Sequence, residues 1–104
     1  MAYDAAKDLC VLYVQGLDVT PAPIGDTKAL RVGQRVYALG TPEGFELTLS
    51  EGLISGLREA GGGRYLQTTA PMSEGSSGGG LFDSNGRLIG ITSFVFSAGQ
   101  NLNF

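Results

Sequence analysis

The chain has 104 residues, which is enough for one small domain with a single hydrophobic core. Its net charge of −3 and its lack of basic tracts argue against nucleic acids and anionic membranes as partners, because these are recognised through positive charge. No apolar run is long enough to cross a bilayer, so we expect no membrane insertion in this segment. The residue pattern does not require a metal or a cofactor, and none is expected.

The first expected element is a strand at residues 8–14, which are apolar almost without interruption after Asp8. This pattern is typical of a strand that is covered on both faces, so it predicts that Cys10 is buried as a small core residue. By residue type alone, Asp8 is a turn or capping residue. Residues 16–33 carry prolines and glycines that predict a loop, with one helical turn at residues 26–30.

The remainder of the chain alternates short apolar segments with turn residues, and no segment has a helical period. A glycine inside a strand usually marks a bulge or a bend, which we expect at Gly52. The sequence Asp-Ser-Asn-Gly at residues 83–86 predicts a tight hairpin. The pattern therefore predicts an all-β fold, a single small antiparallel β-barrel. The expected strands beyond the loop are residues 35–39, 45–57, 64–69, 80–82, 87–94 and 100–104.

The loop at residues 73–81 reads Ser-Glu-Gly-Ser-Ser-Gly-Gly-Gly-Leu, and this pattern indicates a site for acyl transfer. Glycines let a backbone turn sharply, so Ser77 can be exposed as a nucleophile beside amides that point at a developing negative charge. A phosphate-binding loop would need a lysine here, and an α/β-hydrolase elbow would need a downstream histidine; the sequence has neither. A flexible loop of glycine and serine is consistent with the composition alone.

Several segments in sequence order resemble trypsin-like serine proteases, and together they cover nearly the whole chain. Residues 8–12 are similar to the Asp-Leu-Ala-Val-Leu strand that carries the aspartate of the catalytic triad. Residues 33–44 resemble the Val-Gly-Asp-x-Val-x-Ala-Ile-Gly-Asn-Pro-x-Gly signature of the HtrA/Deg branch, and residues 50–56 resemble its Thr-x-Gly-Ile-Val-Ser segment. Residues 67–81 are similar to its stretch from Gln-Thr-Asp-Ala to Gly-Asn-Ser-Gly-Gly-Pro-Leu, in which Ser77 takes the position of the nucleophile. The similarity ends with residues 88–93 and 99–104.

The resemblance implies that residues 1–104 are the second β-barrel of a two-barrel serine endopeptidase, without the first barrel. In that family the active site lies between the barrels, and the histidine, the aspartate and the serine follow one another along the chain. This chain contains the last two of these positions but no histidine. We therefore expect hydrolysis of peptide bonds only when an N-terminal barrel of the same protease supplies the histidine, and an inactive chain on its own.

The resemblance also implies roles for individual residues. Ser77 would attack the scissile carbonyl, and Asp8 would orient the histidine as it becomes imidazolium. The backbone amides of Gly75 and Ser77 would form the oxyanion hole. Because no acidic residue lies in the pocket for the residue before the cleaved bond, the expected preference is for a small or medium apolar side chain. The residues expected to line that pocket are Pro71, Met72, Ser93, Phe94 and Val95.

The chain departs from the family pattern close to the serine. Gly80 and Glu74 replace the usual prolines, Ser76 replaces an asparagine or aspartate, and Thr69 replaces an aspartate. The backbone freedom of three consecutive glycines is consistent with an oxyanion loop that becomes ordered only when a substrate or partner binds. The alternative function is a non-catalytic, protease-like module for peptide binding or assembly, in which Ser77 is an ordinary alcohol.

The expected partners are a polypeptide substrate and the N-terminal barrel of the same protease. In the absence of that barrel, the face between the barrels would be apolar and exposed, so we expect the chain to self-associate through it. The resemblance favours an extracytoplasmic or periplasmic location, because proteases of this type usually act outside the cytoplasm.

Overall fold

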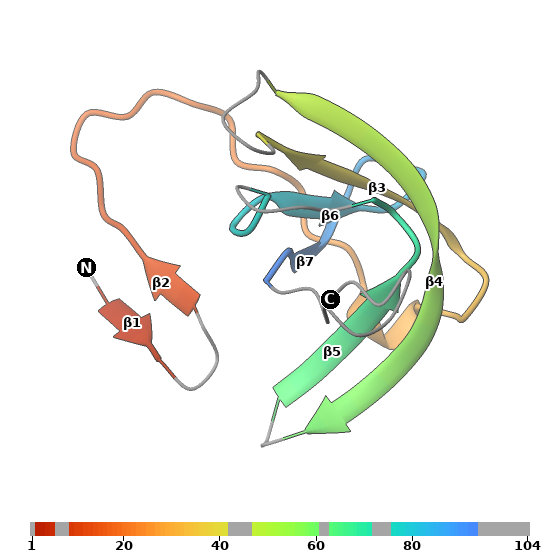
Figure 1. Cartoon of the computed structure of the whole chain (residues 1–104). Coiled ribbons are helices and arrows are strands. Elements are labelled where there is room, and N and C mark those ends of the chain that lie inside the picture. The colour runs from red at the N-terminus through yellow and green to blue at the C-terminus, as the bar shows by residue number, and fades with distance from the viewer. Residues whose placement is uncertain (1, 6–8, 42–46, 61–62, 72–75, 94–104) are drawn as a thin grey trace.

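Seven strands and one 3-10 turn make up the regular structure of the computed structural model, which describes residues 2–5, 9–41, 47–60, 63–71 and 76–93 (Figure 1). All strand pairs in these ranges are antiparallel, and no α-helix occurs in them. The expected all-β antiparallel fold is therefore confirmed. None of the described residues forms a helix that could span a membrane. The elements are β1 (Ala2–Asp4), β2 (Leu9–Val11), η1 (Thr27–Ala29), β3 (Arg35–Gly40), β4 (Thr48–Ala60), β5 (Gly63–Thr68), β6 (Gly80–Phe82) and β7 (Leu88–Ile91).

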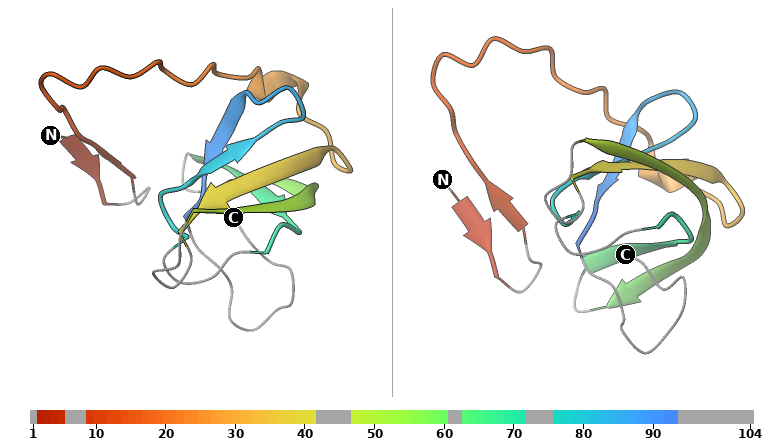
Figure 2. Two further views of the ribbon diagram at one scale, coloured as in Figure 1. Left: turned by 90° about the horizontal axis from the view of Figure 1, so that it is seen from above. Right: turned by 45° about the horizontal axis from the view of Figure 1, so that its top comes forward.

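A five-stranded sheet, in the order β5-β4-β3-β6-β7, curls into a half-barrel (Figure 2). Strand β4 has 13 residues and follows the bend of the sheet (Figure 1). Its first half pairs with β3, where Glu51 lies opposite Tyr37, and its second half pairs with β5, where Leu57 lies opposite Leu66. Strand β4 therefore belongs to both walls of the half-barrel and connects them. The strand that the sequence predicts at residues 100–104 lies outside the described residues.

Gly52 lies within β4 and keeps its register opposite Val36 of β3, so the bulge, one of the two features expected at this glycine, is not found there. The register of β4 shifts between Ile54 and Gly56 instead. A Cβ atom on residue 52 would lie 2.3 Å from the backbone nitrogen of Ala70. Glycine is needed at this position because the segment after β5 lies in backbone contact with β4.

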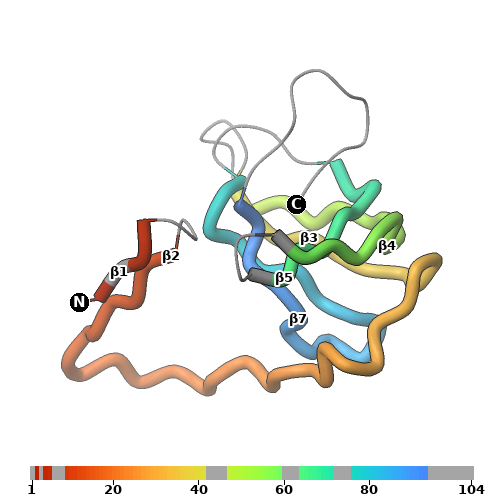
Figure 3. The backbone as a smooth tube through the Cα atoms, turned by 90° about the horizontal axis from the view of Figure 1, so that it is seen from below, coloured from red at the N-terminus to blue at the C-terminus, as the bar shows by residue number. Residues whose placement is uncertain are grey.

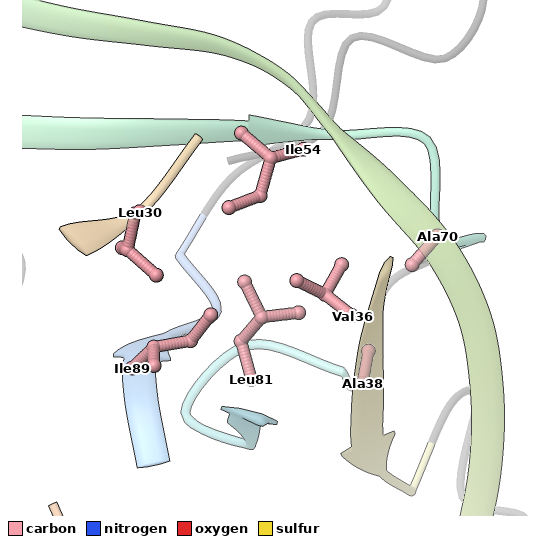
Figure 4. Close-up of a cluster of buried hydrophobic side chains, with 7 residues drawn as sticks. All are labelled: Leu30, Val36, Ala38, Ile54, Ala70, Leu81 and Ile89. Atoms are coloured by element: carbon pink, nitrogen blue, oxygen red, sulfur yellow. The ribbon is translucent and has the colours of Figure 1, made fainter. Parts of the chain in front are cut away.

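All described members of the hydrophobic core lie beyond residue 29 (Figure 4). Val36 and Ala38 are alternate residues of β3 and point to the same face, as the two-residue period of a strand requires. Strands β4, β6 and β7 and two segments beside the sheet add the remaining members. The buried apolar side chains are Leu30, Val36, Ala38, Ile54, Ala70, Leu81 and Ile89.

Strands β1 and β2 form a separate two-stranded sheet, which a long extended segment joins to the half-barrel (Figures 1 and 3). We call residues 2–5 and 9–22 the N-terminal arm. The side chains of Val11 and Tyr13 are 69% and 83% exposed, and Cys10 is also exposed. The predictions of a strand covered on both faces and of a buried Cys10 are therefore wrong, because β1 is the only described strand that pairs with β2 and no other described strand joins or covers the pair.

The predicted hairpin between β6 and β7 is confirmed. Its turn is closed by a bond from the N–H of Gly86 to the carbonyl of Asp83, at 3.1 Å. The Asp83 carboxylate also accepts bonds from the backbone N–H groups of Asn85, at 2.8 Å, and of Arg87, at 3.0 Å. Gly86 has a φ of 75°, a left-handed conformation that glycine adopts without strain. The turn residues therefore hold the start of β7 in place to return along β6.

The chain enters the half-barrel through the expected helical turn. Asp26 caps η1, because its side chain accepts a bond of 2.9 Å from the backbone N–H of Lys28. Immediately before this cap, Gly25 donates to the carbonyl of Leu88 and Leu88 donates to the carbonyl of Pro23, both at 2.8 Å. These bonds attach the end of the extended segment to the start of β7.

Candidate active site

Ser77 lies in a tight turn of residues 76–79, directly before β6. The N–H of Gly79 donates to the carbonyl of Ser76 at 3.2 Å and closes the turn. Gly78 has a φ of 92°, which is typical of the third residue of a type II turn and favours glycine. Ser77 is the second residue of the turn and is exposed. We call residues 76–79 the serine turn; it presents the predicted nucleophile to solvent.

One side of the serine turn lies against the end of β3. A Cβ atom on Gly79 would be 2.1 Å from the carbonyl oxygen of Leu39. A Cβ atom on Gly40 would be 3.4 Å from the carbonyl oxygen of Ser76. The two backbones are therefore in contact, and residue 79 has no room for a side chain.

The other side of the serine turn is bonded to the residue after β7. The N–H of Gly78 donates to the carbonyl of Thr92 at 2.7 Å, and the N–H of Thr92 donates to the carbonyl of Gly79 at 2.9 Å. These bonds continue the pairing of β6 with β7 beyond its pair of Gly80 with Ile91. The backbone of the serine turn is thus held between β3 and the end of β7.

The hydroxyl of Ser77 donates to the backbone carbonyl of Ser93 at 2.7 Å. This bond brings together two of the residues that the sequence assigns to the site, although they are 16 positions apart. A hydroxyl has one proton, so in this arrangement the proton of Ser77 is directed at the Ser93 carbonyl.

Pro71 is exposed and follows a segment that is tied to β4. The N–H of Leu53 donates to the side chain of Thr69 at 2.9 Å, and the side chain of Thr68 donates to the carbonyl of Leu53 at 3.0 Å. The carbonyl of Pro71 accepts a bond of 3.1 Å from the Ser50 hydroxyl. Thr69, which replaces the usual aspartate, therefore supplies an oxygen that accepts a backbone bond.

The structure describes three of the predicted site residues, Ser77, Ser93 and Pro71, and brings the first two into contact. In the described ranges, no group of three or more histidine, cysteine, aspartate or glutamate residues could hold a metal ion. The predicted site residues that lie outside the described ranges are Asp8, Met72, Gly75, Phe94 and Val95.

Thr92 is a residue of the site that the sequence analysis does not identify. Its side chain is 5% exposed, and it bonds to the serine turn through its backbone and its hydroxyl. In the sequence, a threonine at the end of an apolar strand cannot be distinguished from an ordinary strand residue. Only the folded chain places it against residues that lie 13 to 16 positions earlier.

Comparisons with known proteins agree with the sequence resemblance. A family model for the trypsin-like peptidase domain matches residues 1–91. The chain is 41% identical over 107 residues to Protease Do-like 1, chloroplastic, of Arabidopsis thaliana, and 37% identical over 110 residues to the serine protease PepD of Mycobacterium tuberculosis. These matches cover 93% and 94% of this chain and 24% of each relative, so the chain spans about a quarter of their length.

Solved structures are similar in fold and in sequence. A serine endoprotease from Yersinia pestis has a TM-score of 0.82 and 32% identity, and the match covers 97% of this chain and 36% of that one. The HtrA-type protease AlgW with a decapeptide has a TM-score of 0.74 and 34% identity, and the match covers 80% of this chain and 28% of that one. With a family model that covers most of its length and relatives of this similarity, the chain belongs to the trypsin-like peptidase family, in its HtrA/Deg branch.

Proposed function

We propose that this chain provides the nucleophile of a serine endopeptidase, in which Ser77 forms an acyl-enzyme with a polypeptide substrate. The observation that carries the proposal is the serine turn, which exposes Ser77 while β3 and Thr92 hold its backbone. A nucleophile must be both accessible and fixed, because the reacting atoms have to meet at about 3–3.5 Å in the correct orientation. Membership of the HtrA/Deg branch supports the same conclusion.

In the proposed reaction, the Ser77 oxygen attacks the scissile carbonyl while a histidine takes its proton and then gives that proton to the leaving amine. Water next attacks the acyl-enzyme, releases the acid product and restores the Ser77 hydroxyl. The 104 residues contain no histidine, so we assign this base to an N-terminal barrel outside the chain. Asp8 would orient the histidine, and the amides of Gly75 and Ser77 would stabilise the oxyanion by about 3–4 kcal/mol per donor.

The Ser77 hydroxyl must leave the Ser93 carbonyl before its proton can pass to a histidine. A rotation about the Cα–Cβ bond is sufficient, because the exposed side chain can change rotamer freely. The Ser93 carbonyl would then accept a backbone N–H from a substrate that lies extended beside it. Binding of a peptide would in this way release the nucleophile and replace the hydrogen bond that is lost.

The substrate we propose is a polypeptide with a small or medium apolar side chain before the cleaved bond. The five residues assigned to that pocket carry no charge, so a basic side chain would find no counter-ion there. A structure of the related protease AlgW contains a decapeptide, which supports a peptide ligand for this branch.

The N-terminal arm supports the proposed partner. Its side chains Leu12 and Val14 are 67% and 56% exposed, and apolar groups of this size are normally covered by another part of a protein. We assign this covering to the N-terminal barrel that would also supply the histidine. The relatives' names include chloroplastic proteases and periplasmic DegP-like endoproteases, and we propose a location outside the cytoplasm for this protein too.

A fluorophosphonate probe tests the function in the gene product that contains residues 1–104. In the reaction the Ser77 oxygen bonds to phosphorus, fluoride leaves, and the histidine takes the proton. We expect one adduct per chain, located on Ser77 by mass spectrometry and abolished by Ser77→Ala. Ser84→Ala, at the exposed turn of the β6–β7 hairpin, is the matched control and should be labelled like the wild type. A folded, histidine-containing gene product that is not labelled would contradict the proposal and favour the non-catalytic binding module.

A further inference from the structure

Thr92 contacts the serine turn through its side chain as well as through its backbone. Its hydroxyl oxygen lies 2.6 Å from the carbonyl oxygen of Ser76 and 3.2 Å from that of Gly79. A hydroxyl has one proton, and the shorter distance makes Ser76 the acceptor of the stronger bond. Because Thr92 is only 5% exposed, water competes poorly for this bond.

The carbonyl of Ser76 and the N–H of Ser77 belong to the same peptide unit. This unit is planar, and no cis peptide bond occurs among the described residues. In a trans unit the carbonyl and the N–H point in opposite directions. A donor that holds the Ser76 carbonyl toward Thr92 therefore directs the Ser77 N–H away from Thr92.

We propose that Thr92 is a positioning residue, whose hydroxyl sets the direction of the Ser77 N–H and so orients one donor of the oxyanion hole. This inference rests on the proposed function, in which that N–H stabilises the oxyanion. The backbone bonds of residue 92 to Gly78 and Gly79 can be formed by other residue types, because they need only its N–H and carbonyl. The bond to the Ser76 carbonyl requires the hydroxyl.

The composition of the serine turn explains why it needs this additional donor. Ser77 is followed by three glycines, whose backbone has many accessible conformations, so local preference does little to fix the serine turn, and its peptide units depend on hydrogen bonds to hold them. The N–H of Gly79 also donates to the Ser76 carbonyl, but at 3.2 Å, whereas the Thr92 hydroxyl does so at 2.6 Å. The bond from Thr92 is thus the shorter restraint on this unit.

Two variants separate the hydroxyl from the shape of residue 92: Thr92→Val removes the hydroxyl with little change in shape, and Thr92→Ser keeps it. Amide hydrogen exchange in the gene product that contains residues 1–104 measures the turn directly, without any catalytic step. We expect the Gly79 N–H to exchange about fivefold faster in Thr92→Val, as loss of one hydrogen bond implies, and at the wild-type rate in Thr92→Ser. Equal exchange in the wild type and Thr92→Val would overturn the inference.

Binding of a peptide boronate measures the oxyanion hole, because its adduct with Ser77 is tetrahedral and negatively charged. We expect Thr92→Val to weaken boronate binding by about tenfold or more, while KM for a peptide substrate changes by less than about twofold and Thr92→Ser stays close to the wild type. Equal boronate affinity of the wild type and Thr92→Val would contradict a role in orienting the Ser77 N–H. A wild type that does not bind the boronate, together with the expected exchange difference, would overturn the peptidase function and support Thr92 as the residue that holds the turn.

Discussion

Gly79 lies where the serine turn contacts β3, so it affects the position of Ser77. A Cβ atom on this residue would lie 2.1 Å from the carbonyl oxygen of Leu39, and the obstacle is backbone rather than a movable side chain. Gly79→Ala must therefore displace the serine turn from β3. We expect a loss of about 1–3 kcal/mol in the free energy of unfolding, measured by urea denaturation, because overpacking of this kind strains the structure.

Gly90→Ala is the matched control for this prediction. Gly90 lies in β7, and a Cβ atom there would meet the Leu66 side chain at 3.5 Å, which is an ordinary contact. The free energy of unfolding of the Gly90→Ala variant should differ from that of the wild type by less than about 1 kcal/mol. If Gly79→Ala proved as stable as Gly90→Ala, the close approach of the serine turn to β3 would be wrong.

Sequence and fold contribute differently to the individual residues of the site. The resemblance assigns Ser77 to the candidate site because its neighbouring glycines are local in sequence, and it also assigns Ser93 there. It does not identify Thr92, whose hydroxyl matters only because the β6–β7 pairing brings it to Ser76. Contacts between distant segments of this kind cannot be predicted from residue type, since threonine is common in strands for other reasons.

Among the elements, the β6–β7 hairpin positions both Ser77 and Ser93, and Asp83 fixes its turn. The carboxylate of Asp83 accepts two backbone N–H bonds, at 2.8 and 3.0 Å. Asp83→Ala removes the single oxygen, Oδ1, that accepts both bonds, so we expect it to lower the free energy of unfolding by about 1–2 kcal/mol. Asp83→Asn keeps an oxygen acceptor and should cost less than half as much. Thermal unfolding followed by circular dichroism compares the variants, and equal stability of Asp83→Ala and the wild type would contradict this role.

The sequence correctly predicts the elements that depend on neighbouring residues, but not the features that depend on contacts with distant segments. The hairpin at residues 83–86 and the helical turn at η1 depend on nearby residues, and both are found where they are expected. The register shift of β4 lies between Ile54 and Gly56 and not at Gly52, where glycine is needed because Ala70 approaches from another segment. A glycine in a strand indicates a constraint, but its neighbours in sequence do not reveal which one.

For the whole molecule, the N-terminal arm and the half-barrel behave as separate parts of one chain. Seven of its described apolar side chains form the core of the half-barrel (Figure 4), whereas the apolar side chains at residues 9–19 of the arm are exposed. The sequence predicts burial for the arm because its apolar run is typical of a covered strand. The hydropathy of a segment indicates that it is covered in the folded protein, but it does not show which part of the protein covers it.

We expect the isolated 104-residue chain to form dimers or larger species, because the apolar side chains of the arm then have only a second copy to cover them. Tyr13, which is 83% exposed, is a suitable position for the test: Tyr13→Asp adds a charge to the arm without disturbing the core, and should raise the apparent dissociation constant by about tenfold. Val32→Asp is the control, since Val32 is 62% exposed but lies outside the arm. Sedimentation velocity over a range of concentrations compares the three proteins. A wild type that stays monomeric at high concentration, or an equal effect of both substitutions, would show that the arm does not mediate association.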